Sequence, residues 1–204
     1  MIRRAVLLMV AMATALVVLG GVAYALTVQC DDEGDQAPEA GECAGTPDSD
    51  KITGTSGPDA IFALGGRDRV FGLAGNDTVD GFDGNDVIRG GPDDDGGTPD
   101  FGAINLEGGE DSDVVYGEEG DDVIDAAAND TAGSRDRSIG GPGNDLINAT
   151  DNPVNPGIDV VNGGANSDEI FAQDGNVDVI NCGGGQDIAH IDAGIDRVRN
   201  CEST

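Results

Sequence analysis

Aspartate recurs at a nine-residue interval along most of this chain, beginning with Asp50 and Asp59. The phase breaks at Ile104, and insertions of five, five and one residues shift it further along the chain. The phased residues are Asp50, Asp59, Asp68, Asp77, Asp86, Asp95, Asp113, Asp122, Asp136, Asp145, Asp159, Asp168, Asp178, Asp187 and Asp196. Carboxylates repeated in register can hold a row of cations or supply acids and bases, so their placement decides the chemistry.

An aliphatic residue lies two positions after almost every phased aspartate. With Ile104 counted as a phased position there are sixteen such sites, of which thirteen hold Ile, Leu or Val; the exceptions are Gly97, Ser138 and Ala189. One inward β-branched residue between two outward neighbours predicts a three-residue strand. Glycine-rich runs such as Gly72–Gly75 precede the aspartates, and glycine supplies the positive φ that tight turns require. Each unit is therefore predicted to be a six-residue turn followed by a short strand.

Two nine-residue units reverse the chain twice, so they close one coil of eighteen residues. The sixteen units predict an all-β protein, a two-sheet β-solenoid of about eight coils with parallel strands about 4.8 Å apart. The phased aspartates then form two columns. One is predicted to contain Asp50, Asp68, Asp86, Asp122, Asp145, Asp168 and Asp187, with Ile104 as an interruption, and the other Asp59, Asp77, Asp95, Asp113, Asp136, Asp159, Asp178 and Asp196.

Stacked carboxylates require a counter-charge. Two charges about 4.8 Å apart repel by roughly 3 kcal/mol at an effective dielectric near 20. Each coil buries only two aliphatic side chains, worth about 1.5–3 kcal/mol apiece, which does not offset repulsion and chain entropy together. Oxygen-only ligands select a hard cation, and Ca²⁺ accepts a flexible set of six to eight oxygens more readily than Mg²⁺ does. We therefore predict several bound calcium ions.

The segment Gly140–Asn148 reads GGPGNDLIN and resembles the RTX (repeats-in-toxin) nonapeptide, G-G-x-G-x-D-x-U-x. Partial copies extend over about residues 45–200. The resemblance implies a right-handed parallel β-roll in which calcium lies between same-side turns, held by aspartates and glycine-turn carbonyls. The best pairs implied are Asp50/Asp68, Asp68/Asp86, Asp59/Asp77, Asp77/Asp95, Asp95/Asp113 and Asp178/Asp196. The chain departs from typical RTX proteins in carrying an N-terminal signal and cysteines.

Residues 1–25 have the pattern of a secretory signal peptide. Arg3 and Arg4 precede an apolar run, and Ala23-Tyr24-Ala25 forms a small-x-small cleavage site. An uncleaved membrane anchor is the alternative, because residues 5–28 are long enough to span a bilayer. Both readings place the rest of the chain outside the cytoplasm, and cleavage would leave a secreted protein with no membrane segment. Residues 26–44 are then an acidic N-terminal cap or linker, and residues 45–204 are the repeat domain.

The four cysteines suit an oxidising compartment and allow three disulfide pairings. Cys182 and Cys201 are nineteen residues apart, which places them on adjacent coils within reach of a disulfide. We hypothesise a Cys182–Cys201 bridge at the C-terminal end and a Cys30–Cys43 bridge in the N-terminal cap.

Other side chains offer little for catalysis. His190 is the only histidine and falls at an outward strand position, and the sequence contains no H-E-x-x-H, G-x-S-x-G or P-loop motif. We expect no catalytic residues. Four aromatic residues also fall at outward positions, and we interpret them as scattered surface residues: Phe62, Phe71, Tyr116 and Phe171.

The charge balance restricts the partners. The 204 residues include 40 Asp or Glu and 10 Lys or Arg, for a formal charge of −30. Nucleic acids and anionic lipid surfaces are excluded as partners by this acidity. The sequence predicts a secreted calcium-binding protein that folds on calcium and has a structural, adhesive or ion-buffering role, with a cell-surface or polysaccharide ligand as a further partner. The alternatives are an accessory module of an extracellular polysaccharide-acting enzyme, or an acidic disordered polyanion.

Overall fold

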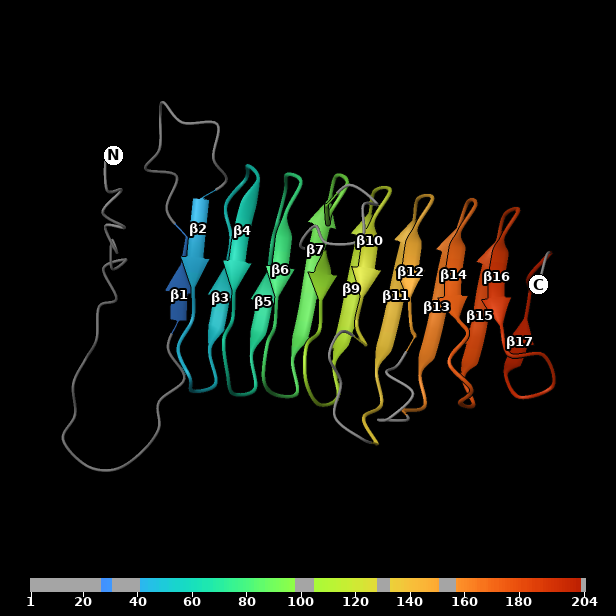
Figure 1. The fold of residues 1–204 in the computed structure, drawn as a ribbon. Coiled ribbons are helices and arrows are strands. Elements are labelled where there is room, and N and C mark those ends of the chain that lie inside the picture. Colours follow the sequence, from blue (N-terminus) through green and yellow to red (C-terminus); the bar gives the residue numbers. More distant parts are fainter. Residues whose placement is uncertain (1–26, 31–40, 98–104, 128–132, 151–156, 203–204) are drawn as a thin grey trace, which may run out of the picture.

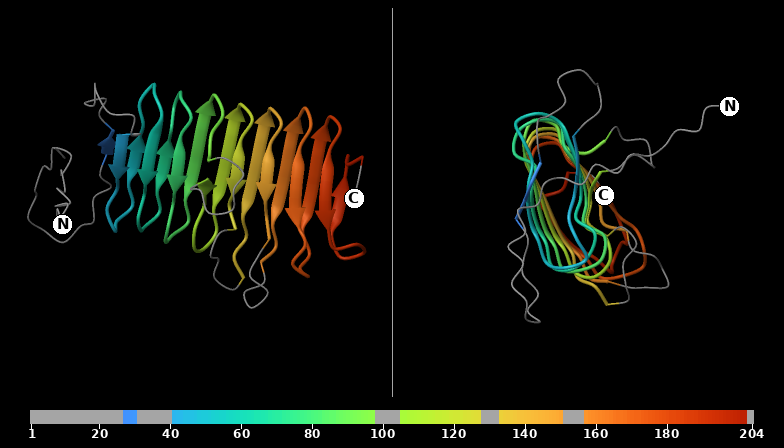
Figure 2. Two further views of the ribbon diagram at one scale, coloured as in Figure 1. Left: turned by 45° about the horizontal axis from the view of Figure 1, so that its top comes forward. Right: turned by 90° about the vertical axis from the view of Figure 1, so that its left-hand side faces the viewer.

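The computed structural model describes residues 27–30, 41–97, 105–127, 133–150 and 157–202, and these form a row of stacked coils (Figure 1). Strands are the only regular elements in these segments. Seen along the stacking axis, the coils superpose as flattened loops with one sheet on each long side (Figure 2). The predicted fold class is confirmed: two parallel sheets form an all-β solenoid whose coils average about 19 residues.

Odd-numbered strands form one sheet and even-numbered strands form the other. The nine-stranded sheet contains β1 (Thr27–Gln29), β3 (Lys51–Thr53), β5 (Arg69–Phe71), β7 (Val87–Pro92), β9 (Val114–Glu119), β11 (Arg137–Pro142), β13 (Val160–Ala165), β15 (Val179–Gly184) and β17 (Arg197–Arg199). The eight-stranded sheet contains β2 (Gly41–Ala44), β4 (Asp59–Phe62), β6 (Thr78–Asp80), β8 (Leu106–Glu107), β10 (Val123–Asp125), β12 (Leu146–Asn148), β14 (Glu169–Ala172) and β16 (Ile188–Ile191).

The core is a double row of aliphatic side chains between the sheets. Ile52 pairs with Val70 and Val70 with Ile88 in one sheet, while Ile61 pairs with Val79 in the other, and all five are fully buried. Ser138 occupies the same kind of position on β11 and is also buried. The strands alternate between buried and partly exposed residues because successive side chains point to opposite faces.

Glycine is required where turns of successive coils approach each other. A Cβ on Gly84 would lie 1.5 Å from the carbonyl oxygen of Gly66, and both residues have positive φ. Leu64, Leu73 and Phe82 also have positive φ, at 81°, 85° and 66°, although they carry side chains. These three side chains are exposed. Each turn therefore bears the conformational cost of a left-handed residue without gaining burial of its side chain.

The order of strands after Asp95 differs from the prediction. We expected a strand around Gly97, but β8 at Leu106–Glu107 is the next strand of the eight-stranded sheet and pairs directly with β6. The sequence between Asp95 and β8 contains one additional repeat length. The aspartates therefore keep their nine-residue spacing, although β8 follows β7 directly in the order of strands. The repeat region from Asp50 onward therefore contains fifteen strands, β3 to β17, where sixteen units were predicted, and the later strands exchange sheets relative to the prediction.

The N-terminal segment joins the solenoid. Strand β1 pairs with β3, and β2 pairs with β4, so each sheet begins in residues 27–44. The hypothesised disulfides are both present, Cys30–Cys43 with a Cα–Cα distance of 5.4 Å and Cys182–Cys201 with 5.1 Å. The predicted signal peptide lies outside the described residues, and the described part of the chain holds no membrane-spanning helix.

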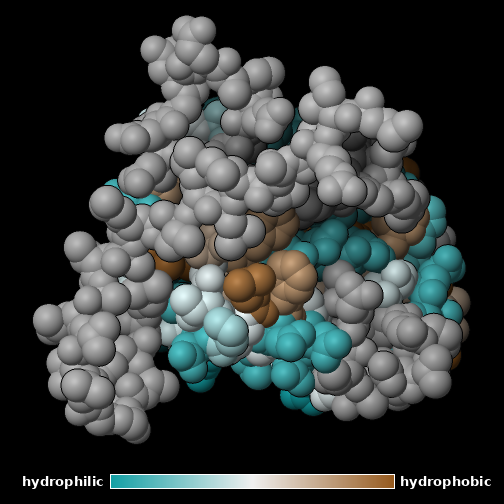
Figure 3. Space-filling view, turned by 60° about the vertical axis from the view of Figure 1, so that its left-hand side comes forward, coloured by the Kyte–Doolittle hydropathy of each residue, from teal (hydrophilic) through white to brown (hydrophobic). Residues whose placement is uncertain are grey.

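The outer surface is mixed in character. In the described part of the face drawn in Figure 3, small apolar patches lie between hydrophilic ones. Leu73 and Ile188 are each 46 % exposed. Isolated apolar side chains of this kind are normal on a protein surface.

Candidate metal centre

Two ladders of aspartates run along the solenoid where the turns enter the strands. In each ladder, the backbone N–H of one aspartate donates to the carboxylate Oδ1 of the aspartate one coil further on, at 2.6 Å from Asp50 to Asp68 and 2.8 Å from Asp59 to Asp77. The first ladder contains Asp50, Asp68, Asp86, Asp113, Asp136, Asp159, Asp178 and Asp196. The second contains Asp59, Asp77, Asp95, Asp122, Asp145, Asp168 and Asp187.

The predicted membership of the columns is wrong beyond Asp95. The pair Asp95/Asp113 does not form, because Asp95 donates to Asp122 at 2.8 Å and Asp86 donates to Asp113 at 2.7 Å. The inserted segment after Asp95 causes this exchange. It adds one repeat length, so every later aspartate moves to the other column while keeping its phase.

The ladder carboxylates are buried. Asp68, Asp77 and Asp113 are fully buried, and every other ladder member except Asp196 is at most 3 % exposed. Their Oδ1 atoms are occupied by the inter-coil hydrogen bonds. The second oxygen, Oδ2, is buried without a hydrogen-bond partner in Asp68, Asp77, Asp86, Asp95, Asp122, Asp145, Asp168 and Asp187. A buried carboxylate oxygen without a partner is costly, so these atoms call for a positively charged ligand.

At three of the four ladder ends, the second oxygen of the terminal aspartate is bonded to the protein, and Asp187 is the exception. Asp50 Oδ2 accepts hydrogen bonds from the backbone N–H and hydroxyl of Thr46, at 2.6 and 2.9 Å. Thr55 donates to Asp59 Oδ2 in the same way. At the other end, Asp196 Oδ2 accepts the N–H of Asp192 at 2.7 Å. The unsatisfied oxygens named above thus belong to interior ladder members and to Asp187, where a cation could lie between two neighbouring turns.

Glycines at the start of the turns leave room around these oxygens. A Cβ on Gly72 would lie within 2.3 Å of Asp77 Oδ2 and 2.6 Å of the carbonyl oxygen of Gly90, one coil away. The same arrangement recurs at Gly140, where Asp145 Oδ2 and the Gly163 carbonyl oxygen face the missing Cβ. Carboxylate and carbonyl oxygens from two coils therefore converge, which suits a hard cation such as Ca²⁺.

Backbone oxygens must complete any such site. Among the described residues, no group of three or more His, Cys, Asp or Glu side chains is arranged to hold a metal. A cation between two turns would thus be held by one or two aspartates together with turn carbonyls. Calcium supplies positive charge to this position when bound, and the residues present fit it.

Burial raises the pKa of the interior carboxyls. The largest cause is desolvation, which outweighs the lowering by the backbone N–H that each Oδ1 accepts. The pKa rises to about 7 in Asp77, Asp86 and Asp145, and to about 8 in Asp95. Neighbouring ladder carboxylates add to the increase, so the charged form of these ladders is disfavoured without a cation.

Sequence reasoning missed the residues that terminate the ladders. Glu202 Oε2 accepts the N–H of Asp187 at 2.9 Å, in the place that a further aspartate would take. It lies fifteen residues after Asp187, outside the repeat phase, so spacing could not identify it. Thr46 and Thr55 do share a nine-residue spacing, and each lies four residues before a ladder aspartate. The sequence alone could therefore have identified them.

His190 lies on the outer face of β16. Its Nε2 is 3.1 Å from Glu169 Oε1, and its ring stacks on Phe171 with centroids 4.5 Å apart. These contacts place the imidazole among surface side chains, as the outward strand position predicted.

Comparison with known proteins gives one match. The profile of the RTX calcium-binding nonapeptide repeat matches residues 44–79, 62–96, 105–131, 130–151 and 154–189. The chain belongs to the RTX calcium-binding repeat family. Neither the curated proteins nor the solved structures contain a match. The RTX matches omit residues 97–104, which lie in the sequence between Asp95 and β8. RTX repeats bind calcium, and the regular buried aspartates of this RTX chain fit that property.

Proposed function

We propose that this protein is a secreted calcium-binding β-roll that folds when calcium binds and then serves as a structural, adhesive or ion-buffering element. The observation that carries the proposal is the set of buried aspartate oxygens without partners in the interior coils. Without a cation, each coil would bury unsatisfied carboxylates next to one another, which few aliphatic contacts per coil can offset. Metal binding and folding are then one process.

Secretion agrees with this coupling. Proteins with RTX repeats are typically extracellular. A chain exported unfolded through its N-terminal signal would meet abundant calcium outside the cell and fold there. The acidic disordered polyanion considered as an alternative function then corresponds to the calcium-free state. We expect an adhesive role to involve a cell-surface or polysaccharide ligand, and we propose no enzymatic activity.

Circular dichroism of the mature chain tests the proposal. We expect a coil-like spectrum in chelator and a β-sheet spectrum in millimolar calcium, with little recovery in the same concentration of magnesium. Small-angle scattering should show compaction over the same calcium range. Equal β-content with calcium and with chelator would refute calcium-coupled folding. An assay in which the chain turns over polysaccharide would refute the purely non-catalytic role.

A further inference from the structure

The basic residues of this acidic protein are segregated on one sheet. Two of the ten, Arg3 and Arg4, belong to the N-terminal segment outside the described residues. Six of the remaining eight lie on strands of the nine-stranded sheet, and two lie in the turns just before β5 and β11. In order, they are Lys51, Arg67, Arg69, Arg89, Arg135, Arg137, Arg197 and Arg199. No strand of the eight-stranded sheet carries a lysine or arginine.

We define the basic face as the outer surface of β3 to β11 in the nine-stranded sheet, formed by Lys51, Arg69, Phe71, Arg89, Tyr116 and Arg137. The cations and rings of this face contact each other. Lys51 Nζ lies 5.4 Å from the centre of the Phe71 ring, and the Arg89 guanidinium lies 4.3 Å from that of Tyr116. Such contacts hold the long side chains against the sheet.

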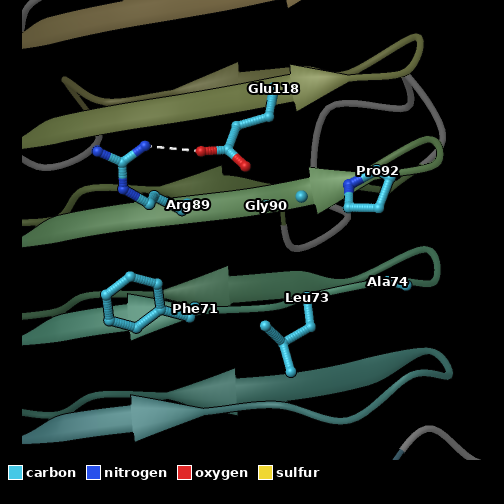
Figure 4. Close-up of a pocket in the computed structure, with 8 residues that line it drawn as sticks. Phe71, Leu73, Ala74, Arg89, Gly90, Pro92 and Glu118 are labelled. Carbon is cyan, nitrogen blue, oxygen red and sulfur yellow. Dashed lines mark hydrogen bonds and ion pairs between the residues drawn. The ribbon is translucent and has the colours of Figure 1, made fainter.

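The basic face contains an open hollow of about 290 Å³. Figure 4 shows Phe71, Arg89 and Glu118 projecting from three successive strands of the same sheet, with Leu73 and Pro92 beside them. Arg89 Nη1 pairs with Glu118 Oε1 at 2.6 Å, and both side chains remain about 40 % exposed. A guanidinium has five donors, so Arg89 can bind a further carboxylate.

The opposite surface of the molecule carries a row of acids, which we call the acidic face: Asp80, Glu107 and Asp125, the outward residues of β6, β8 and β10. Strand register places Asp80 next to Glu107 and Glu107 next to Asp125. These three are outside the aspartate ladders. Partial burial raises the pKa of Glu107, and the charges of Asp80 and Asp125 raise it further. The row is therefore a cluster of three carboxyl groups that the calcium columns do not include, and Asn148 Nδ2 donates to Asp125 Oδ2 within it.

The two faces belong to the same coils. Arg69 and Phe71 on β5 share a coil with Asp80 on β6, and Arg89 on β7 shares one with Glu107 on β8. Tyr116 on β9 likewise shares a coil with Asp125 on β10, and Arg137 begins the next coil. Both sheets have the same strand spacing. A second copy placed beside the first by translation alone would therefore bring the basic side chains of one copy level, along the stacking axis, with the acidic side chains of the other.

We propose that folded copies of this protein associate side by side with parallel axes, the basic face of one against the acidic face of the next. Charge complementarity between the faces selects a second copy as the partner. The contact is heterologous, since the two surfaces differ, and a pure translation does not close into a ring. The product is thus a ribbon that extends one molecule at a time, and it offers a concrete form for the structural role proposed above, on which it rests.

Sedimentation velocity of the calcium-loaded mature chain over a range of concentrations tests this association. The natural chain should sediment as dimers and longer species at high concentration, and added salt should dissociate them because the contact is electrostatic. The double variant Arg69→Glu and Arg137→Glu should bind at least about tenfold more weakly, since each change turns an attraction into a repulsion. Both side chains are exposed, so the fold should persist.

A matched control and a charge swap sharpen the test. Arg197→Glu with Arg199→Glu makes the same charge change on β17, beyond the last strand of the eight-stranded sheet, and should leave association unchanged. Asp80→Lys with Glu107→Lys should dissociate the protein alone, yet restore association when mixed with Arg69→Glu and Arg137→Glu. Circular dichroism on the same samples separates folding from assembly. A folded natural chain that stays monomeric would overturn the proposal, as would failure of the mixture to associate.

Discussion

At the scale of single residues, the two oxygens of each interior ladder aspartate have different tasks. Oδ1 ties one coil to the next by accepting a backbone N–H, as in the 2.9 Å bond from Asp77 to Asp95. Oδ2 of Asp77 and of Asp95 is buried without a protein hydrogen-bond partner. The first atom thus stabilises the stack directly, and the second does so only through a cation. Substitutions that separate the two tasks can test this division.

Asp77→Asn separates them, because the amide oxygen can still accept the N–H of Asp59 while the negative charge is lost. We expect the variant to lose about 1–3 kcal/mol of unfolding free energy in saturating calcium, as for a lost bond to a charged group. Its calcium midpoint should rise. Asp83→Asn, which changes an exposed turn residue, is the control and should have little effect. Urea unfolding at fixed calcium measures both, and equal behaviour of the two variants would contradict the assigned role.

The raised pKa values predict an acid-stabilised calcium-free state. The interior carboxyls have folded pKa values of about 6 to 8, above the ordinary value of 3.8. The folded state therefore binds more protons than the unfolded chain between about pH 4 and pH 8. Their contribution to stability is fully present below pH 4 and is lost as the pH rises through the folded pKa values. In chelator, β-structure should thus increase from pH 8 to pH 5, and an increase in the opposite direction would contradict the pKa assignment.

At the scale of elements, the turns contain two kinds of residue: glycines that a close backbone contact requires, and non-glycine residues held in a strained left-handed conformation. Gly84 must lack a side chain because the carbonyl of Gly66 occupies the space. Leu64 and Leu73 adopt a left-handed conformation that glycine would adopt freely. The turns are thus the elements in which this chain departs most from the glycine-rich RTX pattern.

Leu64→Gly should relieve this strain. The residue has a φ of 81° and an exposed side chain, so glycine removes a cost of about 1–2 kcal/mol and loses little burial. Part of the gain is offset by the greater entropy of glycine in the unfolded chain, for a net increase of about 0.5–1 kcal/mol. Leu64→Ala keeps the strained φ and should give no increase. Thermal unfolding in calcium compares the two, and an equal response would show that the side chain itself matters.

At the scale of the whole molecule, stability comes from contacts between neighbouring coils. Such a solenoid opens from its ends, because terminal coils have a neighbour on one side only. Both disulfides lie at the ends, Cys30–Cys43 at the N-terminal coil and Cys182–Cys201 between β15 and β17. They reinforce the coils that stacking stabilises least, while protein donors from Thr46 and Asp192 satisfy the terminal Asp50 and Asp196.

Removing the C-terminal bridge should therefore have a local effect. Cys182→Ser with Cys201→Ser opens a link across nineteen residues, worth about 3 kcal/mol by loop entropy. Hydrogen exchange in calcium should show faster exchange in β15, β16 and β17, with β3 to β7 unchanged. Cys30→Ser with Cys43→Ser is the mirror control and should affect the N-terminal strands instead. Uniform loss of protection in both variants would contradict end-wise opening.

The sequence by itself determined the repeat, the strand positions from β3 onward except the one expected at Gly97, the inward aliphatic residues and the ladder aspartates, because a nine-residue phase expresses each of them locally. It also indicated the two disulfides. Tertiary structure alone decided which column each aspartate joins after Asp95, since an insertion of one repeat length leaves the phase intact while exchanging the sheets. It also placed Glu202 at the end of a ladder and all described basic side chains on or beside one sheet. Those features depend on how distant segments stack, which spacing along the chain does not record.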